Sequence, residues 1–463
     1  MSYSGKKGHN ATQVSYGTAF TPTNGSGHGT VVGIALDVDA RKIWWRIDGT
    51  WQASGDPANG TNAAYTDLDQ NVTYFPTCGP DSSGVNNAEY SINAGQRPFE
   101  DTAPSGFKCL CVQNLDDTFT GDNINNPSKF FDVRTYIGTG SALTLPADFS
   151  TDLSWMKRRN QSSNTQTFDR VNGYANTLAT ANNSVIAAVS MISATTDNSY
   201  TLGTDGSVNE VNDTYVHWMW DAGSAASGAN TDGTINIADG DQWVNNTCGF
   251  SITKYTGTGA DATFGHGLSS QPQWIIIKKT SQSGNWTCQH KSATLGSGRM
   301  ILDEDYANDT TNADTYWNST APTNEVISIG DHANTNGSTK THICYAWAEI
   351  PGYSSFGGYT GNASTNGPFV FTGFEPAFVL WKRTDAVENW SIIDSARSPI
   401  NVANDWLTPH RNDAESADNA AYAIDILSNG FKVRASAAAA NASNGTYLYC
   451  AFAEHPFKTA RAK

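Results

Sequence analysis

Short apolar runs separated by polar, Gly-rich spacers fill most of this chain. In "KIWWRIDG", Ile43, Trp45 and Ile47 alternate with Trp44 and Arg46. Alternation with a period of 2 is typical of β-strands, and spacers rich in Gly, Asn and Asp are typical of turns. Patterns with the helical period of 3.6 are scarce. The pattern therefore predicts an all-β protein built from sandwich-like modules.

Three blocks of sequence recur in the same order after roughly 105–125 residues, which predicts three tandem repeats. Each repeat opens with a strand whose tyrosine precedes a Gly-containing turn, continues with a strand ending in basic residues, and closes with an aromatic strand. The matching residues are Tyr136, Tyr255 and Tyr359, then Lys157, Lys278 and Lys382, then Trp220, Trp347 and Phe452. We predict that each set occupies equivalent places in three modules of one topology.

The turn glycines have a simple interpretation. Gly257 and Gly259 in "SITKYTGTG" are not followed by Gly-Lys-Ser/Thr or by a helical pattern, as a phosphate-binding loop would require. Glycine is also the usual residue where a turn needs a positive φ. We therefore interpret the repeated turns as structural.

The blocks divide the chain into several modules. We predict an N-terminal β-sandwich over 1–115, a linker over 116–130, and three homologous β-sandwich repeats over 131–247, 248–354 and 355–463. Units of this length exceed the rungs of a solenoid. We therefore expect each module to have its own core, joined like beads on a string, with the basic strand ends in solvent or paired with carboxylates of a neighbour.

Charge and hydropathy exclude several classes of partner. The net charge of -16 would repel a phosphate backbone, so we expect no nucleic-acid partner. The first ten residues lack the apolar core of a signal peptide. No apolar run approaches the ~18 residues of a membrane-spanning helix. We expect neither Sec export nor membrane insertion.

The chain offers little sign of catalytic or metal chemistry. Carboxylates cluster in "DEDY" (303–306), but acidic turns are common in an acidic protein. His217 and His342 lie in predicted strands without the spacing of metal ligands. Cys109 and Cys111 could form a metal pair, and we interpret them as core residues. We therefore expect no enzyme activity, no metal site and no cofactor.

Aromatic side chains are the best candidates for ligand contact. The chain has 14 Trp, and exposed rings can stack on sugars or mark recognition surfaces. Most Trp lie in repeat strands and are expected in the core. Trp44 is a candidate because Trp45 is expected to take the inward face, and Trp51 and Trp243 are candidates because they lie beside turns. We predict that these three contact a receptor or glycan.

The N-terminal region resembles a SPRY-type, concanavalin-like sandwich. The resemblance rests on "GIALD" (33–37), on the hairpin "IWWRIDG" (43–49), where Asp48-Gly49 replaces Asn-Gly, and on "NAGQRPF" (93–99). Only about 30 residues precede "GIALD", where that family has several strands. The missing strands could lie upstream, come from another chain, or be absent from a shorter module.

The whole combination is similar to tail proteins of tailed bacteriophages, especially of aquatic and marine hosts. The repeats also resemble modules of those proteins, up to the closing "YCAFAEHPFKTARAK". The resemblance implies a structural and adhesive virion protein, a tail fibre or tailspike subunit that attaches to the host surface. Its implied partners are other tail proteins, a host glycan or outer-membrane receptor, and two further copies in a homotrimer. The alternatives are a tail-borne polysaccharide depolymerase and a free lectin-like protein.

Overall fold

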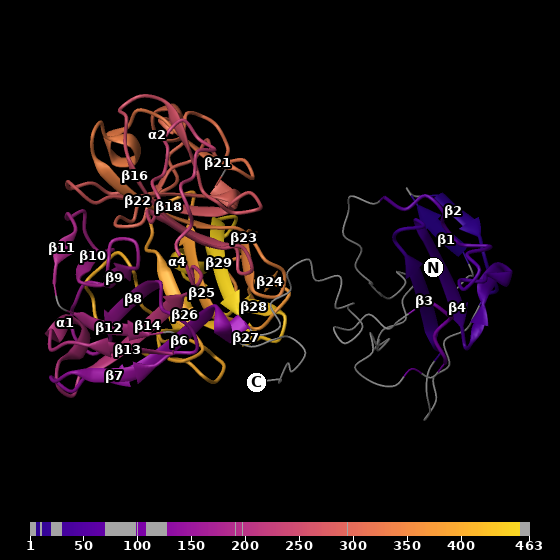
Figure 1. The fold of residues 1–463 in the computed structure, drawn as a ribbon. Helices are drawn as coiled ribbons and strands as arrows, with labels where there is room; N and C mark the ends of the chain where they lie inside the picture. Colours follow the sequence, from indigo (N-terminus) through magenta and orange to yellow (C-terminus); the bar gives the residue numbers. More distant parts are fainter. Residues whose placement is uncertain are drawn as a thin grey trace. The chain divides into compact units, whose positions relative to one another are not determined.

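The computed structural model describes residues 6–9, 12–19, 30–69, 99, 101–107, 127–189, 191–196, 198–293 and 295–453. The chain divides into two compact units, residues 1–116 and 117–463. This boundary lies beside the predicted start of the linker. Nearly all regular structure in both units is antiparallel β-sheet (Figure 1), which confirms the predicted all-β class.

The N-terminal unit contains a three-stranded sheet in the order β3-β4-β5 and the hairpin β1-β2. Its elements are β1 (Lys6–His9), β2 (Thr12–Ser15), β3 (Val32–Asp37), β4 (Lys42–Ile47), β5 (Thr50–Trp51) and η1 (Gln52–Ser54). Between β4 and β5, Asp48 and Gly49 have φ values of 45° and 78°, as a type I′ turn requires. The predicted hairpin is therefore confirmed. The predicted late strand (92–99) lies outside the described residues, except for Phe99.

Module 1 follows the short helix η3 (Pro127–Lys129). Its elements are β6 (Phe131–Ile137), β7 (Leu143–Pro146), β8 (Leu153–Arg158), β9 (Gln166–Asp169), β10 (Asn176–Ala179), β11 (Ala187–Ala188), β12 (Ile192–Thr196), β13 (Ser199–Leu202), α1 (Gly206–Asn209) and β14 (Thr214–Trp220). The larger sheet has the order β11-β10-β9-β8-β14-β6 and the smaller one β12-β13-β7.

Module 2 begins with an additional edge strand. Its elements are β15 (Gln242–Asn245), β16 (Phe250–Thr256), β17 (Ala262–Gly265), β18 (Trp274–Lys279), β19 (Trp286–His290), η4 (Lys291–Ala293), β20 (Met300–Ile301), α2 (Ala313–Trp317), β21 (Val326–Ile329), α3 (Ala333–Asn336) and β22 (Thr341–Trp347). Its sheets have the orders β15-β16-β22-β18-β19-β20 and β17-β21. Because β15 pairs with β16, the segment before residue 248 belongs to module 2, and the predicted boundary at 247 is wrong.

Module 3 repeats the same plan with fewer strands. Its elements are β23 (Ser354–Thr360), β24 (Phe369–Phe371), β25 (Pro376–Arg383), β26 (Ser391–Asp394), η5 (Ala420–Tyr422), β27 (Ile424–Leu427), β28 (Gly430–Val433), α4 (Ala438–Asn441) and β29 (Thr446–Ala453). Its sheets have the orders β23-β29-β25-β26 and β24-β28-β27. In all three modules the opening strand pairs with the closing strand. The closing strand pairs in turn with the strand that ends in the repeated basic residues.

The pairing register places the repeated residues at equivalent positions. Lys157, Lys278 and Lys382 lie opposite Val216, Ile343 and Leu448, each four residues before the closing Trp220, Trp347 or Phe452. The tyrosines also match, since Tyr136 pairs with Tyr215, Tyr255 with His342 and Tyr359 with Tyr447. The predicted equivalence is therefore confirmed for both sets.

A buried asparagine at the end of a short helix holds each Gly-containing turn. In module 1 the Asn209 Oδ1 accepts a hydrogen bond from the Thr139 amide at 2.8 Å, and its Nδ2 donates to the Ser141 carbonyl. Asn336 and Asn441 make the same contacts in modules 2 and 3. A Cβ on Gly138 would lie 2.1 Å from a backbone carbonyl. The turns therefore anchor the sandwich, as the structural interpretation predicted.

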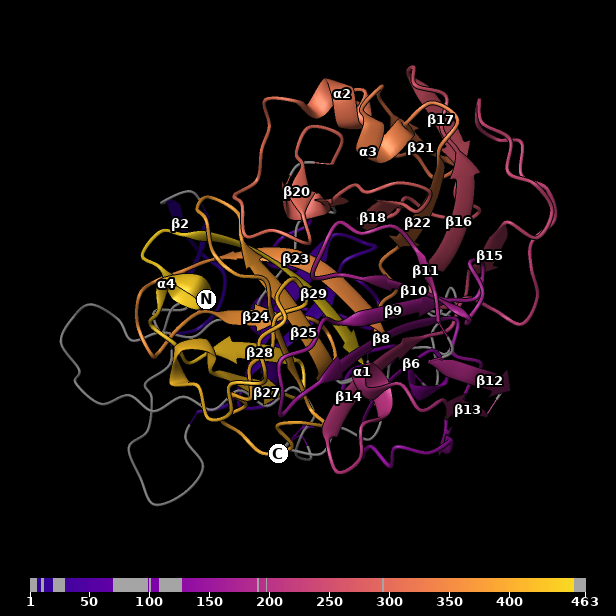
Figure 2. The same cartoon turned by 90° about the vertical axis from the view of Figure 1, so that its left-hand side faces the viewer.

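Each module has its own core between its two sheets, and all three also share a further core. The shared cluster contains large side chains from every module, including Trp155, Trp220, Trp274, Trp347 and Phe452. Trp220 lies 6.1 Å from Trp347 and 5.7 Å from Phe452, measured between ring centroids. Figures 1 and 2 show the three modules grouped around one centre. The prediction of separate beads is wrong, because the outer face of each larger sheet is itself apolar and packs against the other two modules.

Three equivalent contacts close the modules into a ring. Asp169, His290 and Asp394 occupy the same register position in β9, β19 and β26. Each one bonds to a neighbouring module, through the Tyr345 hydroxyl at 2.8 Å, the Tyr449 carbonyl at 3.1 Å and the Trp218 Nε1 at 3.0 Å, respectively. Module 2 thus contacts module 1, module 3 contacts module 2, and module 1 contacts module 3. One chain provides a pseudo-threefold arrangement.

Candidate functional site

The structure reverses the predicted orientation of the tryptophans in β4. Trp44 is 0% exposed, and its Nε1 donates to the Thr61 carbonyl at 2.8 Å. Trp45 is half-buried and packs edge-on against Tyr16 and Tyr65. Trp44 therefore cannot contact a ligand in this fold, and the prediction for it is wrong. Both faces of β4 carry large apolar side chains, so alternation alone did not show which face is buried.

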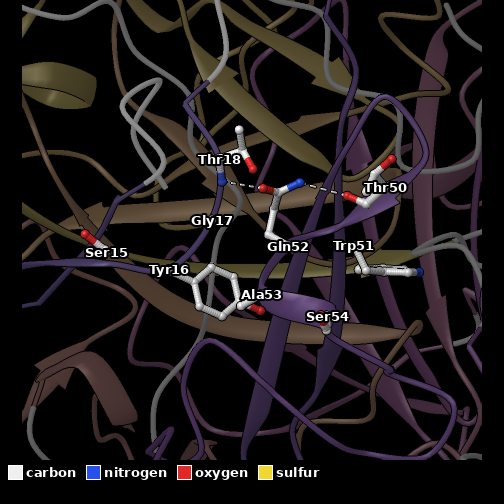
Figure 3. A pocket seen from close by; sticks show the side chains of 9 residues that line it. All are labelled: Ser15, Tyr16, Gly17, Thr18, Thr50, Trp51, Gln52, Ala53 and Ser54. Atoms are coloured by element: carbon white, nitrogen blue, oxygen red, sulfur yellow. Dashed lines mark hydrogen bonds between the residues drawn. The ribbon is translucent and has the colours of Figure 1, made fainter.

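Trp51 lies at an open hollow of about 500 Å³ in the N-terminal unit (Figure 3). One wall is formed by Ser15–Thr18 and the other by Thr50 to Ser54. The lining is mostly hydroxyl, amide and backbone groups around two aromatic rings, Tyr16 and Trp51. An aromatic ring bordered by hydrogen-bonding groups is suited to a polyhydroxylated ligand such as a saccharide.

Gln52 joins the two walls of this hollow. Its Oε1 accepts a hydrogen bond from the Thr18 amide at 2.8 Å, and its Nε2 donates to the Thr50 carbonyl at 2.9 Å (Figure 3). A Cβ on Gly17 would lie 2.4 Å from the Gln52 Oε1, so glycine lets the walls approach each other. A buried side chain therefore fixes the distance between the two walls of the hollow. Sequence reasoning missed Gln52, because nothing in its local pattern marks it.

Two residues beside Trp51 that carry a Cβ have a left-handed backbone conformation. Ala53 and Ser54 have φ values of 52° and 56°, in the left-handed region that costs energy for residues with a Cβ. The Arg46 guanidinium lies 5.3 Å from the Trp51 ring centroid and so orients the ring. Strained backbone and an oriented aromatic ring at an open hollow are features that cluster at binding sites.

Trp243 has a structural contact that the sequence did not reveal. The Arg170 guanidinium lies 4.3 Å from its ring centroid and also forms an ion pair with the buried Asp152 at 2.8 Å. A second hollow of about 660 Å³ lies nearby, lined by Phe149, Asp221 and other residues of modules 1 and 2. One face of the Trp243 ring is therefore occupied by Arg170. Its role in ligand binding stays a prediction without support from this geometry.

The carboxylates near the second hollow are held by the protein itself. The Asp152 Oδ2 accepts a hydrogen bond from the Ala222 amide at 2.7 Å. Burial raises the pKa of Asp152, and the neighbouring Asp221 raises it further. Asp221 accepts from the Gly223 amide and from Asn245. These contacts fix the chain where it passes from module 1 to module 2.

Asp303, the first residue of the acidic cluster at 303–306, also has a structural role. Asp303 Oδ1 accepts a hydrogen bond from the Trp286 amide at 2.8 Å, and Oδ2 accepts from Asn285 Nδ2 at 3.1 Å. Burial raises the pKa of Asp303 to about 6. The carboxylate thus caps the start of β19.

The histidines in the closing strands have hydrogen-bond partners within the fold. His217 Nε2 lies 2.9 Å from the Ser154 hydroxyl, and His342 Nδ1 lies 3.0 Å from the Lys340 carbonyl. Within the described ranges no group of three or more His, Cys, Asp or Glu residues is placed to hold a metal ion. Cys109 and Cys111 lie outside the described residues.

The repeated lysines are buried, although strand ends were predicted to lie in solvent or to pair with carboxylates. Lys157, Lys278 and Lys382 point toward the shared core and are 0% exposed. Their ammonium groups donate to backbone carbonyls, from Lys157 to Ser163 in the following loop at 2.7 Å and from Lys382 to Arg383 at the strand end itself at 2.6 Å. Burial lowers the pKa of each amine to about 8. Backbone carbonyls supply the acceptors that solvent was expected to supply.

These lysines predict a specific pH dependence. Because the folded-state pKa of Lys382 is about 8 and that of an unfolded lysine is about 10.4, the buried amine disfavours folding below pH 8 and stops doing so as pH rises toward 10.4. We expect the free energy of unfolding of the wild type, relative to Lys382→Met, to rise by about 1–3 kcal/mol between pH 7.5 and 10. Chemical denaturation at each pH measures the difference.

The difference in the free energy of unfolding between the wild type and a variant removes the contribution of the other titrating groups, because both proteins contain them. Ile400→Met introduces no titratable group, so its difference from the wild type should stay constant across the same range. A flat difference for Lys382→Met as well would show that its amine is not buried in the folded protein.

Comparisons with known proteins agree with the extent of the second unit. Within the described residues, no helix is both long and apolar enough to cross a membrane. A search of curated proteins finds no match to this chain. Residues 126–456 match the model of a family described as Domain of unknown function (DUF7483). This stretch covers the three modules and most of the chain, and the chain therefore belongs to the DUF7483 family.

Proposed function

We propose that this chain is a structural and adhesive protein of a bacteriophage virion, a tail fibre or tailspike subunit that attaches to the host cell surface. The observation that carries the proposal is the open hollow at Trp51, where an oriented aromatic ring is bordered by hydroxyl and amide groups. Such a surface suits a glycan of the host envelope. The resemblance of the sequence to tail-protein modules supports the location in the tail.

The closed ring of modules supports the structural part of the proposal. Three cores between sheets, one shared core and three hydrogen-bonded seams connect the three modules of this chain. Contiguous packing of this kind resists deformation. A rigid body can transmit contact from the host surface to other tail proteins, which are the proposed partners.

The aromatic residues of the closing strands pack against other modules of the same chain, as Trp220 does with Trp347 and Phe452. These contacts form within one chain and do not bear on the homotrimer that the resemblance implies. The trimer stays a prediction. The mass of the purified protein in solution under native conditions tests it.

Trp51→Ala should weaken binding to the host surface at least tenfold, because truncating an aromatic hot-spot residue costs about 2 kcal/mol or more. Binding of the purified full chain to polysaccharide isolated from the host envelope measures the effect. Tyr306→Ala is the matched control, since Tyr306 is an exposed aromatic residue in module 2. Equal binding by the wild type and by Trp51→Ala would reject the hollow as the adhesive site.

The same incubation separates adhesion from depolymerisation. We expect no new reducing ends, because Asp303 holds backbone and side-chain groups of its own module. Release of reducing ends that stops on changing Asp303 and Asp305 to Asn would establish the depolymerase instead. Antibody labelling of intact particles tests the tail location and excludes a free lectin when the label lies on the tail.

A further inference from the structure

The outer edge of module 3 carries an apolar surface that the ring does not use. β24 lies at the edge of the sheet β24-β28-β27, and no other described strand pairs with its outer side. Phe369 is 46% exposed and Phe371 is 61% exposed, whereas Val370 between them is buried in the core of the module. Two phenyl rings two residues apart on one strand face the same way, so together they form one patch.

The other two modules have no such patch on the corresponding strand. The outward positions of β7 are Thr144 and Pro146, and those of β17 are Thr263 and Gly265. The three strands have equivalent partners, since β7 pairs with β13, β17 with β21 and β24 with β28, so folding does not require aromatic residues at these positions. The fold therefore does not explain why module 3 has two exposed phenylalanines on this strand.

The corresponding edge in module 2 is covered by additional chain. Ile235 donates its amide to the Thr263 carbonyl at 2.8 Å and forms a parallel bridge with Phe264. In module 1 the Arg134 Nη1 donates to the Pro146 carbonyl at 2.9 Å. These contacts show two ways in which this fold protects the same edge.

In module 3 the preceding segment is too short to cover this edge as it does in module 2. Only residues 348–353 lie between β22 and β23, too few to reach back along β24 as the segment around Ile235 does along β17. Along β24, the Phe371 carbonyl accepts a long hydrogen bond of 3.4 Å from the Tyr449 hydroxyl, and a carbonyl oxygen can accept a second one. An edge strand with exposed apolar side chains is a template for pairing with another chain.

We propose that a second copy of this chain covers the edge, with the two β24 strands paired antiparallel about Val370. The sequence Phe369-Val370-Phe371 reads the same in both directions, so this pairing places each phenylalanine opposite a phenylalanine of the second copy. Cross-strand aromatic pairs are favourable in antiparallel sheets. The contact joins two three-stranded sheets into one continuous sheet with twofold symmetry, in which both copies use the same surface.

The surroundings of the patch allow two like surfaces to meet. Lys432 lies opposite Phe369 in the pairing of β24 with β28. On the same sheet Asp425 and Arg434 form an ion pair at 3.4 Å. Both signs of charge thus border the rings, so there is no local charge of one sign to oppose the contact. The net charge of -16 does oppose it at long range, and salt screens that repulsion. The dimer should therefore tighten as salt is added.

The contact is small, which sets the expected affinity. Three residues per strand and two rings per copy bury less than the ~800 Å² per partner of a standard interface. Interfaces of this size are weak or transient, so we expect a weak dimer in solution with a dissociation constant on the order of 10–100 μM. Copies held close together in a particle would be paired.

Analytical ultracentrifugation of the full chain from 1 to 300 μM in 0.5 M NaCl tests the proposal. We expect a monomer–dimer equilibrium, weakened at least tenfold by Phe371→Lys, which places a charge among the four rings. Ile400→Lys is the matched control, because Ile400 is 77% exposed and gains the same charge beside Asn401, which bonds to β27 at the other edge of this sheet. Hydrogen exchange at dimer-forming concentrations should slow at the amides of residues 369 and 371 in the wild type only.

Three outcomes would overturn the proposal. One is a monomer throughout the concentration range, another is a trimer, and the third is a dimer that Phe371→Lys leaves unchanged. Addition of host envelope polysaccharide forms a separate arm. A monomer whose polysaccharide binding is lost in Phe371→Lys would assign the patch to a glycan instead. Failure of Trp51→Ala to weaken adhesion does not affect any of these measurements.

Discussion

Trp220→Ala should destabilise the whole second unit by about 3–5 kcal/mol, the usual cost of truncating a buried tryptophan. Trp220 is fully buried at the centre of the shared core. Its ring meets Trp347 of module 2 and Phe452 of module 3 at 6.1 and 5.7 Å. The cavity would therefore open at the meeting point of three modules. Differential scanning calorimetry should show one cooperative transition for residues 117–463, shifted to lower temperature.

The number of unfolding transitions distinguishes a shared core from separate modules. Separate modules would unfold independently, and the substitution would then lower the transition of module 1 alone. Tyr306→Ala provides the control, because Tyr306 is an exposed aromatic side chain and such surface changes usually stay within about 0.5 kcal/mol. Three transitions, of which only one moves, would contradict the shared core.

The sequence was sufficient to predict the strands and their repetition. Alternation and turn residues are local signals, and they located the hairpin at Asp48-Gly49 and the three matching tyrosines. The register of each closing strand followed from the spacing of its blocks. The alternation of side chains is set by the pleated geometry of the strand itself, so it does not depend on what the strand packs against.

The packing of modules on one another was predicted wrongly, although a signal was present. The run "WIIIKK" (274–279) is buried at every position, and the apolar stretch within it indicates a strand covered on both faces. A separate module with a single core can cover only one face of its larger sheet. The second face had to be covered by other modules, and sequence alone did not say which.

The candidate site was predicted only in part. Trp51 lies at an open hollow, whereas Trp44 is buried, because two adjacent tryptophans on one strand always face opposite ways and the pattern did not say which way is inward. The buried ammonium group of Lys157 also donates to a carbonyl from a distant loop, that of Arg411. Contacts between residues so far apart leave no local pattern.

One structural set could have been found from the sequence. Asn209, Asn336 and Asn441 each stand six residues before the first matched residue of the closing strand, at Tyr215, His342 and Tyr447. Their shared spacing marks them as part of the repeat. In the structure they hold the turns that follow the three tyrosines. A polar residue repeated at a fixed offset from an apolar strand is thus a useful sign of a buried hydrogen-bonding anchor.

Asp394→Ala should open the seam between modules 1 and 3, which are the first and last modules of the ring. The Asp394 carboxylate is fully buried and accepts hydrogen bonds from Trp218 Nε1 at 3.0 Å and Arg397 Nε at 2.6 Å. Arg397 is buried as well and contacts Glu415, which pairs with Arg159 of module 1. Removing one partner of a buried ion pair leaves an uncompensated charge and costs about 3–5 kcal/mol.

Hydrogen exchange locates this loss as well as measuring it. The amides of Ser163 and Glu415 donate across the seam to the carbonyls of Asn412 and Arg159, so in Asp394→Ala they should exchange faster than amides at the other two seams. Asp413→Ala removes a carboxylate from the same loop, but its ion pair with Arg411 is about half exposed and is worth about 0–1 kcal/mol. If the two variants were equally stable, or exchanged alike at all three seams, the buried network would not be what closes the ring.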